Sequence, residues 1–182
     1  MTAKIKLNAA SGGGSFSLQA PSSSANNRVF TLPDSADATL LTSTTATGKI
    51  LQVVSNSSNT NVTTSGGTIS DILNVSITPS SASNKILLMA TCNLFANPSS
   101  NAYSGVRIYK GTSSSGTLLI RQVGGQTDGV NTYTQTGISI VDSPNTTSAT
   151  TYTLAISRES SGTNNVSTDG ETYTIIAQEI AA

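Results

Sequence analysis

The sequence predicts an all-β protein, in which a short N-terminal segment of strands that intertwine between subunits precedes a jelly-roll β-sandwich. Short stretches of alternating apolar and polar residues recur along the chain, and clusters of Gly, Pro, Asn and Asp separate them. Ser, Thr and Asn make up 73 of the 182 residues, a composition that disfavours helices and suits strands and turns. No stretch has the apolar periodicity of an amphipathic helix.

Residues 1–47 differ in character from the rest and form the first of two predicted domains. Short extended pieces at 4–7, 15–19 and 28–32 alternate with turns, and each piece is too short and polar to build a sheet with its own core. Two interpretations remain: a disordered Ser/Gly-rich tail, or strands that pair with identical segments of other subunits. The residues expected to anchor and pack this segment are Ile5, Leu7, Phe16, Leu18, Val29, Phe30 and Leu32.

Residues 48–182 form the second predicted domain, a head built of strands at nearly regular spacing. Residues 85–95 begin with a run of apolar residues, which predicts a central strand buried on both faces. The other predicted strands are 50–54, 72–78, 106–110, 118–123, 134–141, 151–157 and 172–180. Breaks are expected at 97–98, 113–116, 124–125, 142–145 and 160–165, where turn-forming residues gather. This spacing is typical of a β-sandwich or jelly roll.

Charge and composition exclude several classes of function. Nine basic and nine acidic residues give a formal net charge of +0, and only 10% of residues are charged, so nucleic acid is not an expected partner. No stretch approaches the roughly 20 apolar residues that span a bilayer, and no signal peptide is visible, which predicts assembly in a cytoplasm. Hydrophobic residues make up 36%, a share that favours a self-associating structural protein over a lone small domain.

The sequence offers little for catalysis, and we expect neither enzymatic activity nor a cofactor. It contains no histidine, which is the usual general base and a common metal ligand. A glycosidase needs two carboxylates about 5 to 10 Å apart, whereas most of the nine acids fall in predicted turns, where water keeps them ordinary. Asp128 and Asp169 occupy similar Asp-Gly turns that could approach each other, either as turn formers or as calcium ligands.

Tyrosines and amides in the loops of the head are the candidates for contact with other molecules. Two interpretations apply to Tyr103, Tyr109 and Tyr133. They form a platform on which sugars stack, or they pack in the core or at a subunit interface. For a host-surface polysaccharide, we expect contacts from Tyr103, Asn131, Tyr133 and Asn164. Single contacts of this kind are weak, and several heads on one axis would strengthen them through effective concentration.

Several stretches resemble virion structural proteins of tailed bacteriophages, especially those of marine and cyanobacterial phages. Residues 10–21 (ASGGGSFSLQAP) and 27–34 (NRVFTLPD) resemble a segment near the start of their tail-fibre-like proteins. Residues 77–88 and the ending 173–180 (YTIIAQEI) resemble the C-terminal jelly-roll domain of such proteins, which is similar to the trimeric C1q and tumour-necrosis-factor heads.

The resemblance implies a homotrimer on the virion surface, in contact with other tail or capsid proteins and without catalytic residues. It leaves two roles open: a short fibre that contacts host glycans, or a capsid decoration (cement) protein that stabilises the phage head. A free lectin-like binding module remains as a third interpretation. Trimerisation would also let short strands cover one another's edges and let a sparse core gain buried area at the trimer axis.

Overall fold

The computed structural model contains two compact units, Met1–Leu41 and Thr42–Ala182. The structure describes residues 4–8, 11–13, 15–19, 23, 25, 49–96, 102–127, 130–159, 163–166 and 170–182. Within these ranges every regular element is a β-strand, as the sequence predicts. The described part of the chain contains no helix long and apolar enough to cross a membrane.

The N-terminal unit contains an antiparallel hairpin of β1 (Lys4–Asn8) and β2 (Ser15–Gln19). Gly12 and Gly13 lie in the connection at φ angles of 85° and 69°, a backbone region that favours glycine. Both short strands therefore form as predicted, and they pair with each other within one chain.

The seven residues predicted to anchor and pack this unit are placed only in part. Four are cross-strand partners in the hairpin, Ile5 with Leu18 and Leu7 with Phe16. The predicted strand at 28–32, with Val29, Phe30 and Leu32, lies outside the described residues. Pairing between subunits stays a prediction.

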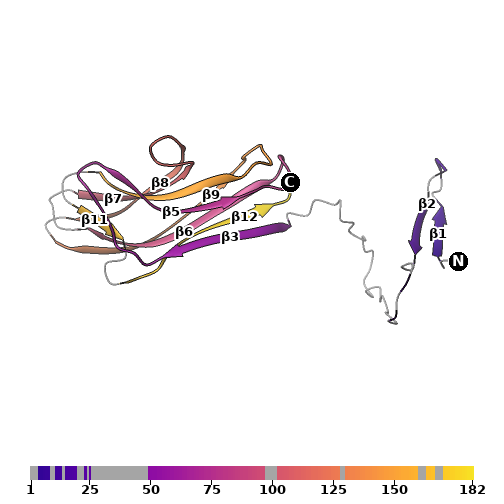
Figure 1. The fold of residues 1–182 in the computed structure, drawn as a ribbon, viewed down its shortest axis with the longest axis horizontal. Helices are drawn as coiled ribbons and strands as arrows, with labels where there is room; N and C mark the ends of the chain where they lie inside the picture. The colour runs from indigo at the N-terminus through magenta and orange to yellow at the C-terminus, as the bar shows by residue number, and fades with distance from the viewer. Residues whose placement is uncertain are drawn as a thin grey trace. The chain divides into compact units, whose positions relative to one another are not determined.

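The second unit, the head, is a sandwich of two antiparallel sheets (Figure 1). Its strands are β3 (Ile50–Ser58), β4 (Val62–Ser65), β5 (Ile69–Ile77), β6 (Lys85–Ala96), β7 (Ala102–Lys110), β8 (Thr117–Thr127), β9 (Thr132–Asp142), β10 (Thr150–Arg158), β11 (Thr163–Val166) and β12 (Tyr173–Ile180). One sheet has the order β5-β10-β7-β8. The other has the order β3-β12-β6-β9, and β11 and β4 extend it beside the last residues of β6.

The head folds as one long hairpin that is rolled into the sandwich. Its strands pair from the outside inwards: β3 with β12, β4 with β11, β5 with β10, β6 with β9, and β7 with β8. At the tip, Gly111 has a φ of 88° and its N–H donates to the Thr151 carbonyl at 2.8 Å. Nested pairs divided over two sheets are the arrangement of a jelly roll. The predicted all-β sandwich is thus confirmed.

The core lies between the sheets and consists of the inward-facing residues of alternating strands. Leu88 on β6 and Leu154 on β10 are fully buried there. The predicted central strand at 85–95 has neighbours on both edges, but the prediction that both its faces are buried is wrong. Leu87 and Met89 are only half-buried, because no described layer packs on the outer face of this sheet.

Two predicted breaks contain residues that belong to strands. The glycine pair at 124–125 belongs to β8, where Gly125 is the extra residue of a β-bulge opposite β7. A Cβ at Gly124 would lie only 2.7 Å from Thr136 Oγ1, so close packing explains the glycine. The break at 160–165 contains the start of β11, and β4 was not predicted. Both are four-residue strands rich in Thr, Asn and Ser, a composition shared with turns.

Candidate contact surface

The head has two unlike ends. The chain enters at Lys49, whose carbonyl accepts a hydrogen bond from the Ala181 N–H at 3.0 Å, so both residues lie at what we call the entry end. At the opposite end, the far end, β6 finishes at Ala96 and β9 begins at Thr132. Figure 1 shows the C-terminus beside the start of β3 at the entry end.

The four residues predicted to contact a polysaccharide all lie towards the far end. Tyr133 is the second residue of β9, opposite Phe95, and Asn131 immediately precedes that strand. Asn164 lies in β11, which pairs with the last residues of β6. Tyr103 is the second residue of β7, in the other sheet. The fold therefore gathers these residues at one end, while their contact with a polysaccharide stays a prediction.

The three tyrosines have different environments. Tyr133 is 63% exposed and Tyr103 is 40% exposed, so both present surface to a partner. Tyr109 is only 4% exposed, and its Oη lies 3.3 Å from Arg107 Nη1, which donates to it. The platform interpretation is wrong for Tyr109, whereas the packing interpretation is right for it.

A hollow of about 310 Å³ lies beside Tyr133. The Tyr133 ring packs against Phe95, with the ring centroids 4.9 Å apart and the ring planes tilted by 46°. The residues that line the hollow are Asn93, Tyr133, Thr134, Gln135 and Glu171.

Four of these lining residues were missed by reasoning from the sequence, and one of them, Thr134, directly follows the predicted Tyr133. Asn93 and Gln135 are cross-strand partners in β6 and β9, and Glu171 precedes β12. Their proximity follows from strand register and from the roll of the hairpin, which no local spacing in the chain reveals. The hollow thus joins one exposed aromatic ring to two amides and one carboxylate.

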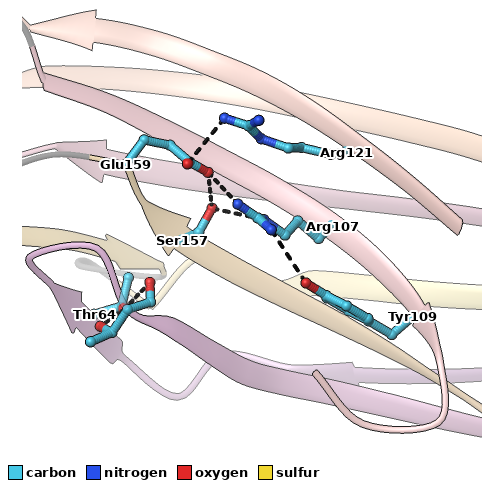
Figure 2. A network of polar contacts seen from close by, with 7 residues as sticks. Thr64, Arg107, Tyr109, Arg121, Ser157 and Glu159 are labelled. Carbon is cyan, nitrogen blue, oxygen red and sulfur yellow. Dashed lines mark hydrogen bonds and ion pairs between the residues drawn. The ribbon is translucent and has the colours of Figure 1, made fainter. Parts of the chain in front are cut away.

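A second group of polar side chains lies on the outer face of the sheet β5-β10-β7-β8 (Figure 2). Arg107 donates from Nη2 to Glu159 Oε1 at 2.6 Å and from Nε to Ser157 Oγ at 3.2 Å. Arg121 forms an ion pair with Glu159 Oε2 at 3.0 Å. Burial alone would raise the pKa of Glu159, but hydrogen bonds from Arg107 and Ser157 and the nearby positive charges lower it. The carboxylate stays ionised and is unsuited to act as an acid at neutral pH.

A third polar group lies at the entry end around the fully buried Glu179 of β12. Gln52 Nε2 donates to Glu179 Oε2 at 2.6 Å. Asn84 Nδ2 at 2.6 Å, the Ser80 N–H at 2.7 Å and Ser80 Oγ at 2.8 Å all donate to Oε1. Burial alone would raise the pKa of Glu179, but these hydrogen bonds outweigh burial and hold the pKa at about 2.

The prediction that acids at turns sit in water is wrong at Asp142, and two acids outside the predicted turns, Glu159 and Glu179, are also held by other groups. Glu179 is interior, and Glu159 is ion-paired with two arginines. Asp142 ends β9, and its Oδ2 accepts hydrogen bonds from Tyr152 Oη and Lys110 Nζ, each at 2.7 Å. All three carboxylates bind other parts of the chain, which assigns them to structure.

The described residues offer neither a cluster of metal ligands nor a reactive thiol. Asp128 and Asp169, the candidate calcium ligands, lie outside the described residues. Within the described ranges, no three Cys, Asp or Glu residues come together as a metal site would require. Cys92 is buried in the core, and burial raises the pKa of its thiol to about 12, so it stays protonated and unreactive.

Comparison with known proteins gives no family: no protein-family model and no curated protein matches the chain. Among solved structures, the VP2 subviral particle of infectious bursal disease virus is similar with a TM-score of 0.38 and 16% identity, over 72% of this chain and 38% of that one. The structure of the Gx strain of that virus gives 0.38 and 15% identity, over 81% and 43%. The chain thus spans less than half the length of these neighbours. Likeness at these TM-scores carries no conclusion about function.

Proposed function

We propose that this chain is a non-enzymatic structural protein of a bacteriophage virion, assembled in the host cytoplasm as a short homotrimeric fibre on the particle surface. The observation that carries the proposal is the difference between the two ends of the head. The N-terminal segment joins the head at Lys49, and Tyr103 and Tyr133 are exposed towards the opposite end. A head held at one end by residues 1–47 would present these tyrosines outwards to host glycans.

The outer face of the sheet β3-β12-β6-β9 supports self-association. The register places Val53, Leu87 and Val141 in one row across it, with Gln178 between the first two. Ile176 and Met89 lie in the next row, which Ser55 and Ser139 complete. The two valines are more than half exposed, and neither row contains a charged side chain. Exposed apolar rows of this kind mark interaction surfaces. Further copies of this chain are the proposed occupants, because the face is uncharged in both rows and the chain as a whole carries no net charge.

The oligomeric state tests this face. Light scattering on the full chain should give about three times the 18.5 kDa chain mass. Val141→Asp should lower the mass towards the monomer by burying an unpaired charge in the interface. Val123→Asp is the matched control, because Val123 is similarly exposed but lies on the other sheet, and it should stay trimeric. A stable, folded wild-type monomer at micromolar concentration would refute the trimer.

The place on the particle tests the role. Gold-labelled antibody against the head, viewed on intact particles by electron microscopy, should mark a few copies at the tail. Labels spread over the capsid would instead assign the chain to the decoration (cement) class. Particles without label would leave the free lectin-like module as the better description.

A further inference from the structure

We propose that the hollow beside Tyr133 binds one ring of a neutral hexopyranose, an inference that rests on the proposed contact between the head and host glycans. Its volume of about 310 Å³ lies at the lower end of the range of small-molecule sites, roughly 300–1,000 Å³. That space suits a single sugar ring better than a long segment of polymer. The remainder of the polysaccharide would extend from the far end into solvent.

The tyrosine ring supplies a fixed surface for stacking. Tyr133 packs against Phe95 across the strand pair, which restricts the orientation of its ring before any ligand arrives. The side chain is nevertheless 63% exposed, so a ligand can reach it. A hexopyranose has a face of C–H groups that packs on an aromatic ring and hydroxyl groups at its rim. Because the ring is already held, stacking costs little conformational entropy.

The polar lining matches a ligand with several hydroxyl groups. The amides of Asn93 and Gln135 each carry both a donor and an acceptor, and the Thr134 hydroxyl can act as either. Sugar hydroxyls also both donate and accept, so each pairing can be satisfied. An apolar ligand would bury these polar groups without hydrogen bonds, at a cost in free energy.

Charge then selects between neutral and acidic sugars. Among the described residues that line the hollow, Glu171 is the one charged residue. Its carboxylate accepts hydrogen bonds from hydroxyl groups but repels the carboxylate of a uronic acid at short range. The geometry therefore favours neutral hexoses.

The test uses the full chain and four simple probes. Methyl β-D-glucopyranoside, methyl β-D-galactopyranoside and methyl α-D-mannopyranoside are neutral, and methyl β-D-glucuronide is the acidic counterpart of the first. Each is titrated into ¹⁵N-labelled protein while the side-chain amide signals of Asn93 and Gln135 are followed by NMR. At least one neutral glycoside should shift both signals with a dissociation constant on the order of millimolar, and the glucuronide should bind about tenfold more weakly. The proposal would be overturned if neither amide signal shifted with any of the three neutral glycosides. Equal dissociation constants for the glucoside and the glucuronide would also overturn it.

Variants assign the binding to the hollow. Tyr133→Ala should weaken binding about tenfold, while Tyr133→Phe keeps the ring and should bind nearly as the wild type does. Glu171→Gln should reduce the difference between the dissociation constants of the glucoside and the glucuronide, because it removes the negative charge. Tyr103→Ala is the matched control, because Tyr103 is exposed towards the same end but does not line the hollow. Equal losses from Tyr103→Ala and Tyr133→Ala would contradict the site.

Two safeguards keep the result interpretable. Gln135→Ala removes a lining amide at an exposed position, and it replaces Tyr133→Ala if the latter changes the circular dichroism spectrum. The position on the particle is measured separately. If the antibody detects the chain on the virion but the chain binds none of the glycosides, the sugar site is refuted and the virion role is retained. Binding by a chain absent from the virion would support the sugar site and refute that role.

Discussion

Glu179 keeps its negative charge inside the head, and the described groups that donate to it are neutral. The donors to its two oxygens are an amide on β3, an amide and a hydroxyl in the 79–84 turn, and one backbone N–H of that turn. One side chain therefore joins three segments of the chain at the entry end. A buried carboxylate of this kind stabilises the fold only while it stays ionised.

We expect the head to lose stability in acid. The pKa of Glu179 is about 2 in the folded protein, against an ordinary value of 4.5, so above pH 4.5 its ionisation contributes on the order of 3 kcal/mol to the free energy of unfolding. The unfolded chain takes up the proton first as the pH falls, so this contribution is lost between about pH 4.5 and about pH 2. Denaturant unfolding measured across that interval checks it. A flat profile would contradict the role of Glu179.

Glu179→Gln isolates this residue from the other acids. The amide would direct its NH2 group either at Gln52 or at Asn84 and Ser80, all of which donate to the carboxylate, so the free energy of unfolding at neutral pH should fall by about 2–4 kcal/mol. Asp71→Asn is the matched control. Asp71 is exposed and accepts from the Ser113 N–H at 3.2 Å, and an asparagine keeps an acceptor there. That change should stay within about 0.5 kcal/mol.

Catalysis offers a second test on individual residues. Purified protein incubated with host-surface polysaccharide should leave the length of the polysaccharide unchanged by size-exclusion chromatography. The lowered pKa values of Glu159 and Glu179 leave neither able to hold a proton for a leaving group at neutral pH. Depolymerisation that disappears on Asp128→Asn or Asp169→Asn would place the protein among tailspike enzymes instead.

At the scale of the elements, long side chains of the sheet β5-β10-β7-β8 lie over small residues on the outer face of the same sheet. Ala155 and Ser157 of β10 are almost completely buried although their strand parity directs them outwards, away from the core residue Leu154. In the neighbouring strand β7, Arg107 lies opposite Ala155 and donates to Ser157. The long side chains of arginines cover small residues in this way while their charged ends pair with carboxylates.

Gly105→Ala tests that cover. An added Cβ would lie 2.5 Å from Ser157 Oγ and 3.1 Å from Glu159 Oε1, so the polar group must shift. We expect a loss of about 1–3 kcal/mol in the free energy of unfolding, measured by denaturant. Gly137→Ala is the matched control in another strand, because its nearest atoms lie at 3.8 Å. Similar values for both variants would show that loss of glycine, and not the clash, matters.

Strand positions were predictable wherever alternation was strong. Residues 72–78 alternate clearly in the sequence, and β5 ends with the buried Val75 and Ile77 as expected. The short strands β4 and β11 were not predictable, because their residues are equally common in turns and the pairing partners lie far along the chain. Long-range pairing decides such segments, and local propensity does not.

The exposure of Tyr103 and Tyr133 was predictable from the sequence, but the hollow beside Tyr133 was not. Tyr133 follows a turn predicted from the sequence, which indicated its exposure, and the side chain is indeed exposed. Tyr109 lies on an outer face by strand parity, yet Arg107 donates to it and the side chain is buried. The hollow depends on Asn93, Gln135 and Glu171, which meet through register across three segments. Neither effect leaves a signal in the spacing of residues.

At the scale of the whole molecule, we expect the N-terminal unit to anchor the chain on the particle and the head to fold without it. Deleting residues 1–47 should leave a folded head, because the core residues that the structure describes belong to strands after Lys49. The circular dichroism spectrum and a cooperative thermal transition should persist, while incorporation into particles, followed by immunoblot, should be lost. Normal incorporation of the shortened chain would assign the anchor to the head instead.

The rolled hairpin also sets the order of events during synthesis. Gln52 and Glu179 hydrogen-bond to each other although they are 127 positions apart, and β12 lies between β3 and β6. A ribosome therefore exposes β3 long before the strand that must cover its edge exists. Pairings this distant in sequence close slowly. Each head can close only after β12 has been translated, so assembly between chains would start from finished heads. A product that stops before Tyr173 would lack the strand between β3 and β6 and would be degraded by proteases.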